Sequence, residues 1–574
     1  MLMMRRAIIG IVVSLSLVIS ASAESTDSSA DATEKPQFKE NIKSLGIRPE
    51  GFTIIQNSMR YGPYMRHVSY VAAKGKTRNI IQWNDRTSPV YYAVRPEFPK
   101  FSAEGRHAYI AYESKKSKAS VVVDWELIGK YDNACDFRFS PDGKRYVYRA
   151  AKDGKQSLII DGEPDKWVTG LPMNDEDNIR FSPDSRHIAY VVYDGKACKV
   201  VQDGKEQKHY FQLIKDLKFS PDSKKLAYKG RVKKEGPREK WCVVVNGEKH
   251  EVYYKIFDLR FSPNSKHLAY TAFKDKGKMV LVLDGKEVDT HKQYGLPVFS
   301  PDSQKLAYSF MEGKEFHVVI NSDKGPGFPK VYKFYYSPDS SRYAYIAGEK
   351  GHWQCVVDGE AERAYQSVDA FKFSPDSSRY AYGAVTDKGG KIVVDGTPHQ
   401  THLSVGEPYF SPDSKHTVYR ARPKNVKRWI TIFDGEKRGD YYPGIAEYIF
   451  SKDSNHLAYN AILEFDKNLM VVDGKKYCEE ERFNILDDPY FSPDSNYVAY
   501  IAGHGKKGEF FLVVNDHVLP TTYNGFFKDT PLVFDDATHF HTIGMRETDT
   551  GPEFLQIDVE IPENIKLETD ISDL

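Results

Sequence analysis

A phrase of about ten residues returns ten times along this chain and constrains the fold more than any other feature. It reads FSPDSRHIAY from residue 181, FSPDSKKLAY from residue 219 and FSPNSKHLAY from residue 261. The copies follow one another at intervals of roughly forty residues, a period typical of propellers and solenoids. Their opening aromatic residues are Phe139, Phe181, Phe219, Phe261, Phe299, Tyr336, Phe373, Phe410, Phe450 and Phe491.

Each copy predicts four short strands. Ser-Pro-Asp-Ser suits a type I turn, with Pro presetting its second position, and the alternating residues that follow predict a strand. After a loop of variable length, a valine-rich run ends in Asp-Gly or Asn-Gly, the strongest short-range signal for a tight hairpin. One more strand leads into the next copy. Four short antiparallel strands in this length make one blade of a β-propeller.

A tyrosine stands nine residues after the opening aromatic in every copy, and the residue before it is Ala in all copies except those with Val147 and Val418. Neighbouring strand residues face opposite sides of a sheet. We therefore expect the large ring to pack on one neighbouring blade, while the small residue admits the other blade closely. The tyrosines are Tyr148, Tyr190, Tyr228, Tyr270, Tyr308, Tyr345, Tyr382, Tyr419, Tyr459 and Tyr500.

The phrase resembles the WD-repeat-like propeller motif of the TolB-like family, over about residues 100–545. The resemblance implies a propeller but no particular function, because such propellers serve as binding modules, peptidase appendages and sometimes enzymes. Degraded copies at 67–85, 101–112 and 534–543 bring the count to twelve or thirteen, against the four to eight blades usual in one ring. We expect an all-β fold of tandem β-propellers, with about 12–13 four-stranded antiparallel blades in two rings.

The N-terminus predicts export. A basic leader, MLMMRR, precedes an apolar run of about fourteen residues and then Ala-Ser-Ala before Glu24, which is the pattern of a secretory signal peptide. A membrane anchor is the competing interpretation, but the run is short for a transmembrane span. The predicted division is a signal peptide at 1–23, a disordered or extended segment at 24–50, propellers at 51–297 and 298–560, and a tail at 561–574. We expect a periplasmic or extracellular protein with no transmembrane segment after cleavage.

Composition and motifs exclude several function classes. With 81 basic and 80 acidic side chains, the chain lacks the dominant basic field that nucleic-acid binding requires. It contains no G-x-S-x-G elbow, H-E-x-x-H, Walker or dinucleotide glycine motif. Its five scattered cysteines form neither a zinc pattern nor a disulfide framework. We predict no catalytic residue, no metal and no cofactor.

Charged residues recur on the innermost strand of the early blades. A basic residue directly precedes the opening aromatic, and an acidic residue often stands two positions earlier. Because residues two apart share one side of a strand, we expect both to line the channel of the first ring. They would bind a carboxylate or phosphate or satisfy one another as structural ion pairs. These candidate binding residues are Arg138, Arg180, Lys218, Arg260, Asp136, Asp216 and Asp258.

Lysine-rich loops between the second and third strands, at 231–240, 273–278, 422–428 and 503–509, offer a basic rim or simply solubilise the chain. The predicted function is an exported, non-catalytic scaffold that binds a protein or an anionic cell-envelope polymer through this variable-loop face. The alternative is a hydrolase or lyase acting on an extracellular glycan. Its carboxylates at the channel mouth of the second ring would be Glu407, Glu447 and Asp488.

Overall fold

The computed structural model describes residues 36–573, except 56, 169, 172–177, 236–237, 276, 465–466, 482 and 527–530. Two compact units divide the chain, residues 1–37 and 38–574, and the strands of the described residues all belong to the second. The predicted signal peptide lies outside the described residues. Where the chain is described it contains no α-helix, and no helix long and apolar enough to cross a bilayer. Its short 3-10 turns are Pro63–Met65 (η1), Glu479–Glu481 (η3), Glu563–Ile565 (η4) and Ile571–Asp573 (η5).

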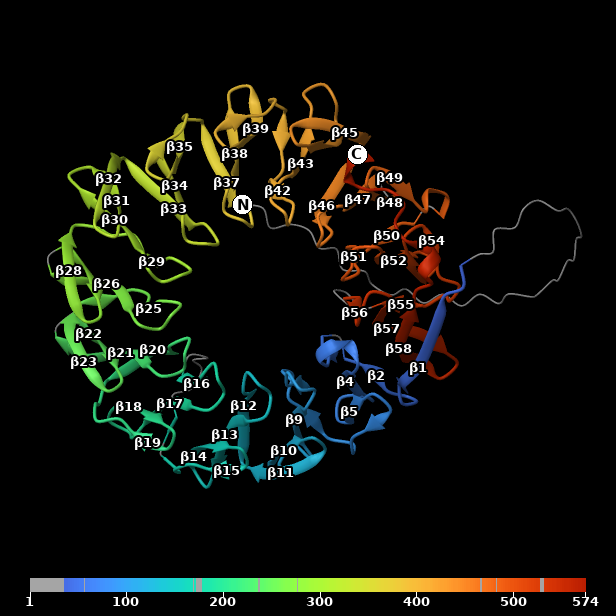
Figure 1. Ribbon diagram of the computed structural model, residues 1–574. Helices are drawn as coiled ribbons and strands as arrows, with labels where there is room; N and C mark the ends of the chain where they lie inside the picture. The colour runs from blue at the N-terminus through green and yellow to red at the C-terminus, as the bar shows by residue number, and fades with distance from the viewer. Residues whose placement is uncertain are drawn as a thin grey trace, which may run out of the picture. The chain divides into compact units, whose positions relative to one another are not determined.

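The described strands form thirteen antiparallel sheets of four or five strands, which follow one another around a ring (Figure 1). We number the sheets 1 to 13 in chain order. They are β2–β6 (53–87), β7–β11 (93–131), β12–β15 (133–164), β16–β19 (179–206), β20–β23 (213–253), β24–β28 (255–291), β29–β32 (298–328), β33–β36 (330–361), β37–β40 (367–398), β41–β45 (404–442), β46–β49 (444–477), β50–β54 (485–518), and β55–β58 (525–560) with β1 (39–47).

Sheet 9 shows how one copy of the phrase folds. It comprises β37 (Ser367–Phe373), β38 (Tyr380–Thr386), β39 (Gly389–Val394) and β40 (Thr397–Pro398), paired in that order. The Ser377 amide donates to the Ser374 carbonyl at 2.9 Å, which closes the predicted turn. Tyr382 is fully buried against the hydrophobic cluster shared with sheet 8. The predicted all-β propeller of four-stranded antiparallel blades is confirmed.

The first strand of the described chain joins the last two strands in sheet 13. Strand β1 (Lys39–Ile47) pairs with β58 (Gly551–Glu560), which in turn pairs with β57 (His539–Thr548). Leu45 and Phe554 then join the hydrophobic cluster that includes Val68 and Tyr70 of sheet 1. Part of the segment predicted as disordered or extended is therefore a strand of the last blade.

The blades form one ring instead of the two expected. At the predicted boundary between residues 297 and 298, Met279 and Leu281 of sheet 6 pack with Phe310 and Val319 of sheet 7. Comparable clusters join the other pairs of consecutive sheets, and the last one joins sheet 13 to sheet 1. The blade number depends on the small rotation between neighbouring sheets, which the repeated phrase does not encode.

Candidate functional site

The basic residues predicted to line the channel belong to strands that pair with the strand after the predicted turn of their sheets, and these strands lie on the inside of the ring (Figure 1). Arg138 belongs to β12 (Asn133–Phe139) and Lys218 to β20 (Leu213–Phe219). Arg180 in β16 (Ile179–Phe181) and Arg260 in β25 (Arg260–Phe261) occupy the same repeat position.

Several of these cations donate hydrogen bonds to the next sheet. The Arg138 guanidinium donates to the Ile179 carbonyl at 3.1 Å, and Lys218 Nζ donates to the Leu259 carbonyl at 3.2 Å. Lys100, at the same repeat position of sheet 2, donates to the Phe137 carbonyl at 2.9 Å. These positive charges thus join neighbouring blades. The sequence pattern alone allowed either this structural role or the binding of an anionic ligand.

The aspartates two residues earlier turn toward the second strand of their own sheet. Strands β12 and β20 carry β-bulges at Asp136 and Asp216, with φ of 55° and 54°, and a bulge breaks the simple alternation of side chains. Asp136 pairs with Arg149 Nε at 3.1 Å, and Asp216 pairs with Lys229 Nζ. Asp258 is exposed in the link between β24 (Lys255–Ile256) and β25. The structure therefore divides the predicted cation–aspartate pairs between two different sets of partners.

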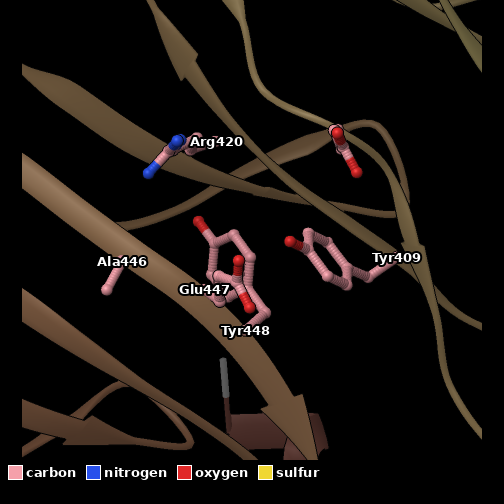
Figure 2. A pocket seen from close by; sticks show the side chains of 6 residues that line it. Tyr409, Arg420, Ala446, Glu447 and Tyr448 are labelled. Atoms are coloured by element: carbon pink, nitrogen blue, oxygen red, sulfur yellow. The ribbon is translucent and has the colours of Figure 1, made fainter. Parts of the chain in front are cut away.

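Two of the three acidic residues predicted for the second ring do meet. Glu407 and Glu447 line one cavity of about 140 Å³ between sheets 10 and 11, together with Tyr409, Arg420 and Tyr448 (Figure 2). Tyr409 lies on β42 (Tyr409–Phe410), Arg420 on β43 (Thr417–Arg422), and Glu447 and Tyr448 on β46 (Gly444–Phe450). Asp488 is exposed and is not part of the lining.

Contacts within this cavity are mostly structural. Glu407 pairs with Lys372 at 3.3 Å, and the Arg420 guanidinium donates to the Ile445 carbonyl of the next sheet. The rings of Tyr409 and Tyr448 make an edge-to-face contact, with centroids 6.1 Å apart and an interplanar angle of 67°. Burial raises the pKa of both phenols, and the charges of Glu447 and Glu407 raise that of Tyr409 further. Both tyrosines are therefore neutral hydroxyl groups at physiological pH.

Sequence reasoning missed a larger cavity, of about 380 Å³, between sheets 5 and 6. Its lining residues are Lys215, Lys229, Glu239, Trp241, Tyr254, Lys255 and Ile256. Lys215 and Lys255 are exposed, and the Trp241 indole donates to Glu239 at 3.2 Å. The cavity adjoins the lysine-rich segment at 231–240. A tryptophan directly after that segment, Trp241, is the sequence feature that indicates a binding cavity here. An aromatic face flanked by ammonium groups can hold a ring that bears a carboxylate.

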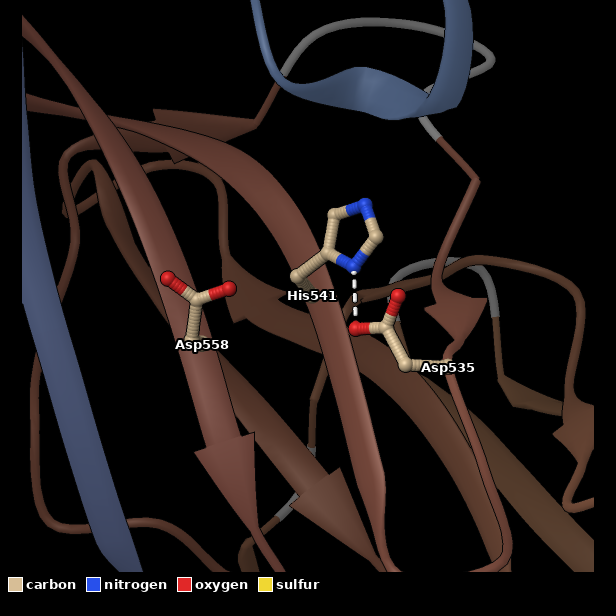
Figure 3. Close-up of side chains that lie close together, drawn as sticks. All are labelled: Asp535, His541 and Asp558. Carbon is tan, nitrogen blue, oxygen red and sulfur yellow. Dashed lines mark hydrogen bonds and ion pairs between the residues drawn. The ribbon is translucent and has the colours of Figure 1, made fainter.

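A third group of polar side chains lies at the junction of sheets 13 and 1. Asp535, His541 and Asp558 place their ligand atoms within 4.8 Å of one another, the spacing of a metal site (Figure 3). Arg66 of sheet 1, however, contacts Asp535 at 3.0 Å and Asp558 at 3.7 Å, so a guanidinium already neutralises both carboxylates. His541 is fully buried between Asp535, at 2.7 Å, and the Tyr64 carbonyl in η1. We assign this group to ring closure.

No family model matches the sequence, and no curated protein matches it. Similar solved structures include a eukaryotic initiation factor, 11% identical over 73% of this chain and 98% of that chain, with a TM-score of 0.28. TolB from Acinetobacter baumannii is 14% identical over 46% of this chain and 75% of that chain, with a TM-score of 0.21. The β-propeller domain of the Trilobed protease from Pyrococcus furiosus is 15% identical over 46% and 95%, with a TM-score of 0.22. These values carry no argument about function, and the propeller assignment rests on the sheet topology.

Proposed function

We propose that this chain is an exported, non-catalytic propeller scaffold that binds an anionic cell-envelope polymer or an acidic protein at its variable-loop face. The observation that carries the proposal is the cavity of about 380 Å³ beside Trp241, which is lined by three lysines. This volume lies within the range of roughly 300–1,000 Å³ that accommodates small organic groups. Exposed cations at Lys424, Lys427, Lys506 and Lys507 extend the positive charge to the loops of sheets 10 and 12.

The use of the inner charged residues supports a non-catalytic role. Lys100, Arg138 and Lys218 donate to carbonyls of the following sheet, while Asp136 and Asp216 neutralise cations of their own sheet. Catalytic acids and bases need to be available to substrate. Groups that hold neighbouring blades together are poor candidates for that task.

Binding to polymers of known charge tests the proposal. We expect the mature protein to bind polygalacturonate, to bind dextran far more weakly, and to lose affinity for polygalacturonate as salt rises. The double variant Lys215→Gln/Lys255→Gln should weaken binding by about tenfold or more. The matched control, Lys224→Gln/Lys266→Gln, removes two exposed lysines from the tight-turn ends of the same sheets and should have little effect. Equal losses in both variants would refute a site at the Trp241 cavity.

Binding to an acidic protein needs a separate measurement. Mature protein and the Lys215→Gln/Lys255→Gln variant are used as baits in an envelope extract of the source cells. Acidic proteins that the first bait retains and the second bait loses support an acidic protein as the partner. Export is tested by sequencing the N-terminus of the protein recovered outside the cytoplasm, which should begin at Glu24 if the signal peptide is cleaved.

A glycan hydrolase remains the second candidate, because Glu407 and Glu447 share one cavity and glycosidases act through paired carboxylates. Two observations favour the scaffold: Lys372 already pairs with Glu407, and about 140 Å³ is below the usual size of a small-molecule site. Incubation with envelope glycans and measurement of new reducing ends distinguishes the two. Release that disappears in both Glu407→Gln and Glu447→Gln would establish the hydrolase.

A further inference from the structure

The segment 561–573, which we call the strap, runs back from sheet 13 over the tight-turn ends of sheets 12 and 11. Its Leu567 amide donates to the Asn496 carbonyl at 2.9 Å, and its Ile571 amide donates to the Asn455 carbonyl at 2.7 Å. The Leu567 and Ile571 side chains pack against the hydrophobic clusters of the seams between sheets 11 and 12 and between sheets 10 and 11. The predicted tail thus docks on two blade seams, and residues 566–570 connect its 3-10 turns η4 and η5.

The carbonyls that hold the strap occupy one repeat position, five residues after the opening aromatic. At most other seams the carbonyl in this position accepts a hydrogen bond from a cation of the preceding sheet. Arg145 donates to Arg186, Lys225 to Lys266, Lys305 to Ser341, Arg342 to Ser378 and Arg379 to Lys415. At the strap seams the cation is replaced by His416 and His456, which pair with Asp434 and Asp473 of their own sheets. The strap amides thus take the place of the missing cations.

The seam between sheets 6 and 7 has the same histidine but is not covered by the strap. His267 pairs with Asp284 at 2.7 Å. At this seam the carbonyl five residues after the opening aromatic, Phe299, belongs to Gln304. That carbonyl accepts a hydrogen bond from Asn321 of its own sheet, at the long distance of 3.5 Å. A peptide could donate there as Ile571 does to Asn455.

Apolar side chains at this seam are also exposed to an unusual degree. Leu306 and Tyr308 are partly exposed, whereas their counterparts at the strap seams, Leu457 and Tyr459, are at most 1% exposed. Leu283 is partly exposed, and Val288 is 51% exposed. We call these four residues, Leu283, Val288, Leu306 and Tyr308, the apolar strip.

One other seam without a cross-seam cation, between sheets 4 and 5, lacks these features. Gln202 stands there in the position of Leu283, and Leu226, the counterpart of Leu306, is 1% exposed. A histidine in the seam therefore does not by itself create an apolar strip. Only the seam between sheets 6 and 7 combines the histidine with exposed apolar residues among these repeats of the described chain.

We propose that the apolar strip binds an acidic segment of a partner protein that carries an apolar residue next to a carboxylate. This is the chemistry of the strap at the seam between sheets 10 and 11, where Ile571 packs against the seam and directly follows Asp570. The exposed Lys286 lies two residues from Val288 of the strip and offers a positive charge to such a segment, while Asp284 already pairs with His267 at 2.7 Å. The strip lies on the tight-turn face, so the proposal does not depend on the lysine-lined cavity of the opposite face.

A labelled peptide with the sequence of residues 564–573, NIKLETDISD, tests this inference on the full chain. We expect one peptide to bind per chain, with the affinity falling by about tenfold or more in Leu283→Glu, which buries a charge against an acidic ligand. Val245→Glu is the matched control, because Val245 holds the same repeat position in sheet 5, where Lys225 already occupies the cross-seam carbonyl at 2.8 Å. A peptide with Ser in place of Leu567 and Ile571 should not bind.

A second variant keeps the test decisive if Leu283→Glu folds poorly. Val288→Gln introduces the residue that sheet 4 has at this position, where Gln207 accepts a hydrogen bond from Tyr228 at 3.0 Å. The new amide should engage Tyr308, close the strip and reduce peptide binding. The inference is overturned if wild type does not bind the peptide, if both variants bind it normally, or if a photo-crosslinking peptide labels only residues around Asn455 and Asn496.

Discussion

The Asp302 backbone amide donates a hydrogen bond of 2.9 Å to Ser340 Oγ, across the seam between sheets 7 and 8. The first serine of each turn instead bonds its own aspartate, as Ser300 does with Asp302 at 2.6 Å. The repeated phrase is therefore both a turn and a joint between blades. The same joint links Asp142 to Ser185, Asp184 to Ser223, Asp222 to Ser265, Asn264 to Ser303, Asp339 to Ser377, Asp376 to Ser414, Asp413 to Ser454 and Asp453 to Ser495.

Replacing Ser340 with Ala should loosen one seam. The substitution removes the acceptor of the Asp302 amide, and the loss of such a bond costs about 1 kcal/mol. Hydrogen exchange should accelerate at Asp302 while amides in distant sheets keep their rates. Ser341→Ala is the control, because Ser341 Oγ bonds only within its own turn, to Asp339 at 2.8 Å. Unchanged exchange at Asp302 would show that the joint contributes nothing to cohesion.

The turn aspartates should make the ring sensitive to acid. The Ser300 hydroxyl and the Gln304 amide lower the pKa of Asp302, and similar bonds bring that of Asp413 to about 2 despite some burial. A lowered native pKa means that the unfolded carboxyl binds protons more tightly, so the stabilisation is present above about pH 4 and is lost as pH falls. Wild type should lose thermal stability between pH 4 and pH 2.

Asparagine is a matched probe of this effect, because Asn264 already makes the same bonds, to Ser262 at 2.8 Å and to Ser303 at 2.9 Å. The stability difference between wild type and Asp302→Asn should be largest near pH 7 and vanish toward pH 2. The converse variant, Asn264→Asp, should add acid sensitivity. A pH-independent difference for Asp302→Asn would assign its effect to geometry and not to charge.

The repeated phrase was sufficient to predict the blades, because turn chemistry and strand alternation are local. The repeat also predicted the buried tyrosines, with one exception. Tyr308 is partly exposed, and Val288 stands at the repeat position where Gln207 accepts a hydrogen bond from Tyr228. Turn chemistry and strand alternation could not predict whether the blades form one ring or two. The change of inner-strand residues near residue 298 coincides with the seam between sheets 6 and 7, where Leu306 and Tyr308 are partly exposed, but that seam is still packed.

The candidate sites were less predictable because they depend on departures from regular strands. Bulges at Asp136 and Asp216 divert both carboxylates from the basic residues two positions later. Glu407 and Glu447 come from different sheets, and only the packing of sheets 10 and 11 unites them. The docking of residues 561–573 depends on contacts with sheets 11 and 12 that no local pattern encodes.

Truncation of Leu45 should weaken ring closure. Leu45 is 3% exposed in β1 and packs with Phe554 against sheet 1. Leu45→Ala should cost about 2–5 kcal/mol and accelerate hydrogen exchange in β58. Ile47→Ala, on the same strand but 42% exposed, should change stability little. If both variants unfold at the wild-type denaturant concentration, β1 does not hold the ring closed.

The strap should dock more stably at acidic than at alkaline pH. Burial lowers the pKa of His456, but the hydrogen bond to Asp473 and the charges of Asp473 and Asp570 outweigh it, so the net pKa is raised. Burial also raises the pKa of Asp473. His456 therefore binds a proton more tightly in the native state, and its contribution is complete below about pH 6 and declines as pH rises through its native pKa. The contribution of Asp473 is confined to more acidic pH, because it is lost as pH rises through the native pKa of that carboxyl. His456→Gln should lose most stability at pH 5.5 and least at pH 8.5, as measured by thermal unfolding and by protease cleavage after Lys566.

His187→Gln removes the corresponding pair, His187–Asp203 at 2.8 Å, from a seam that the strap does not reach, and it should leave cleavage at the strap unchanged at every pH. Cleavage of the His456 variant that parallels wild type across this range would mean that the histidine only fills space beneath the strap.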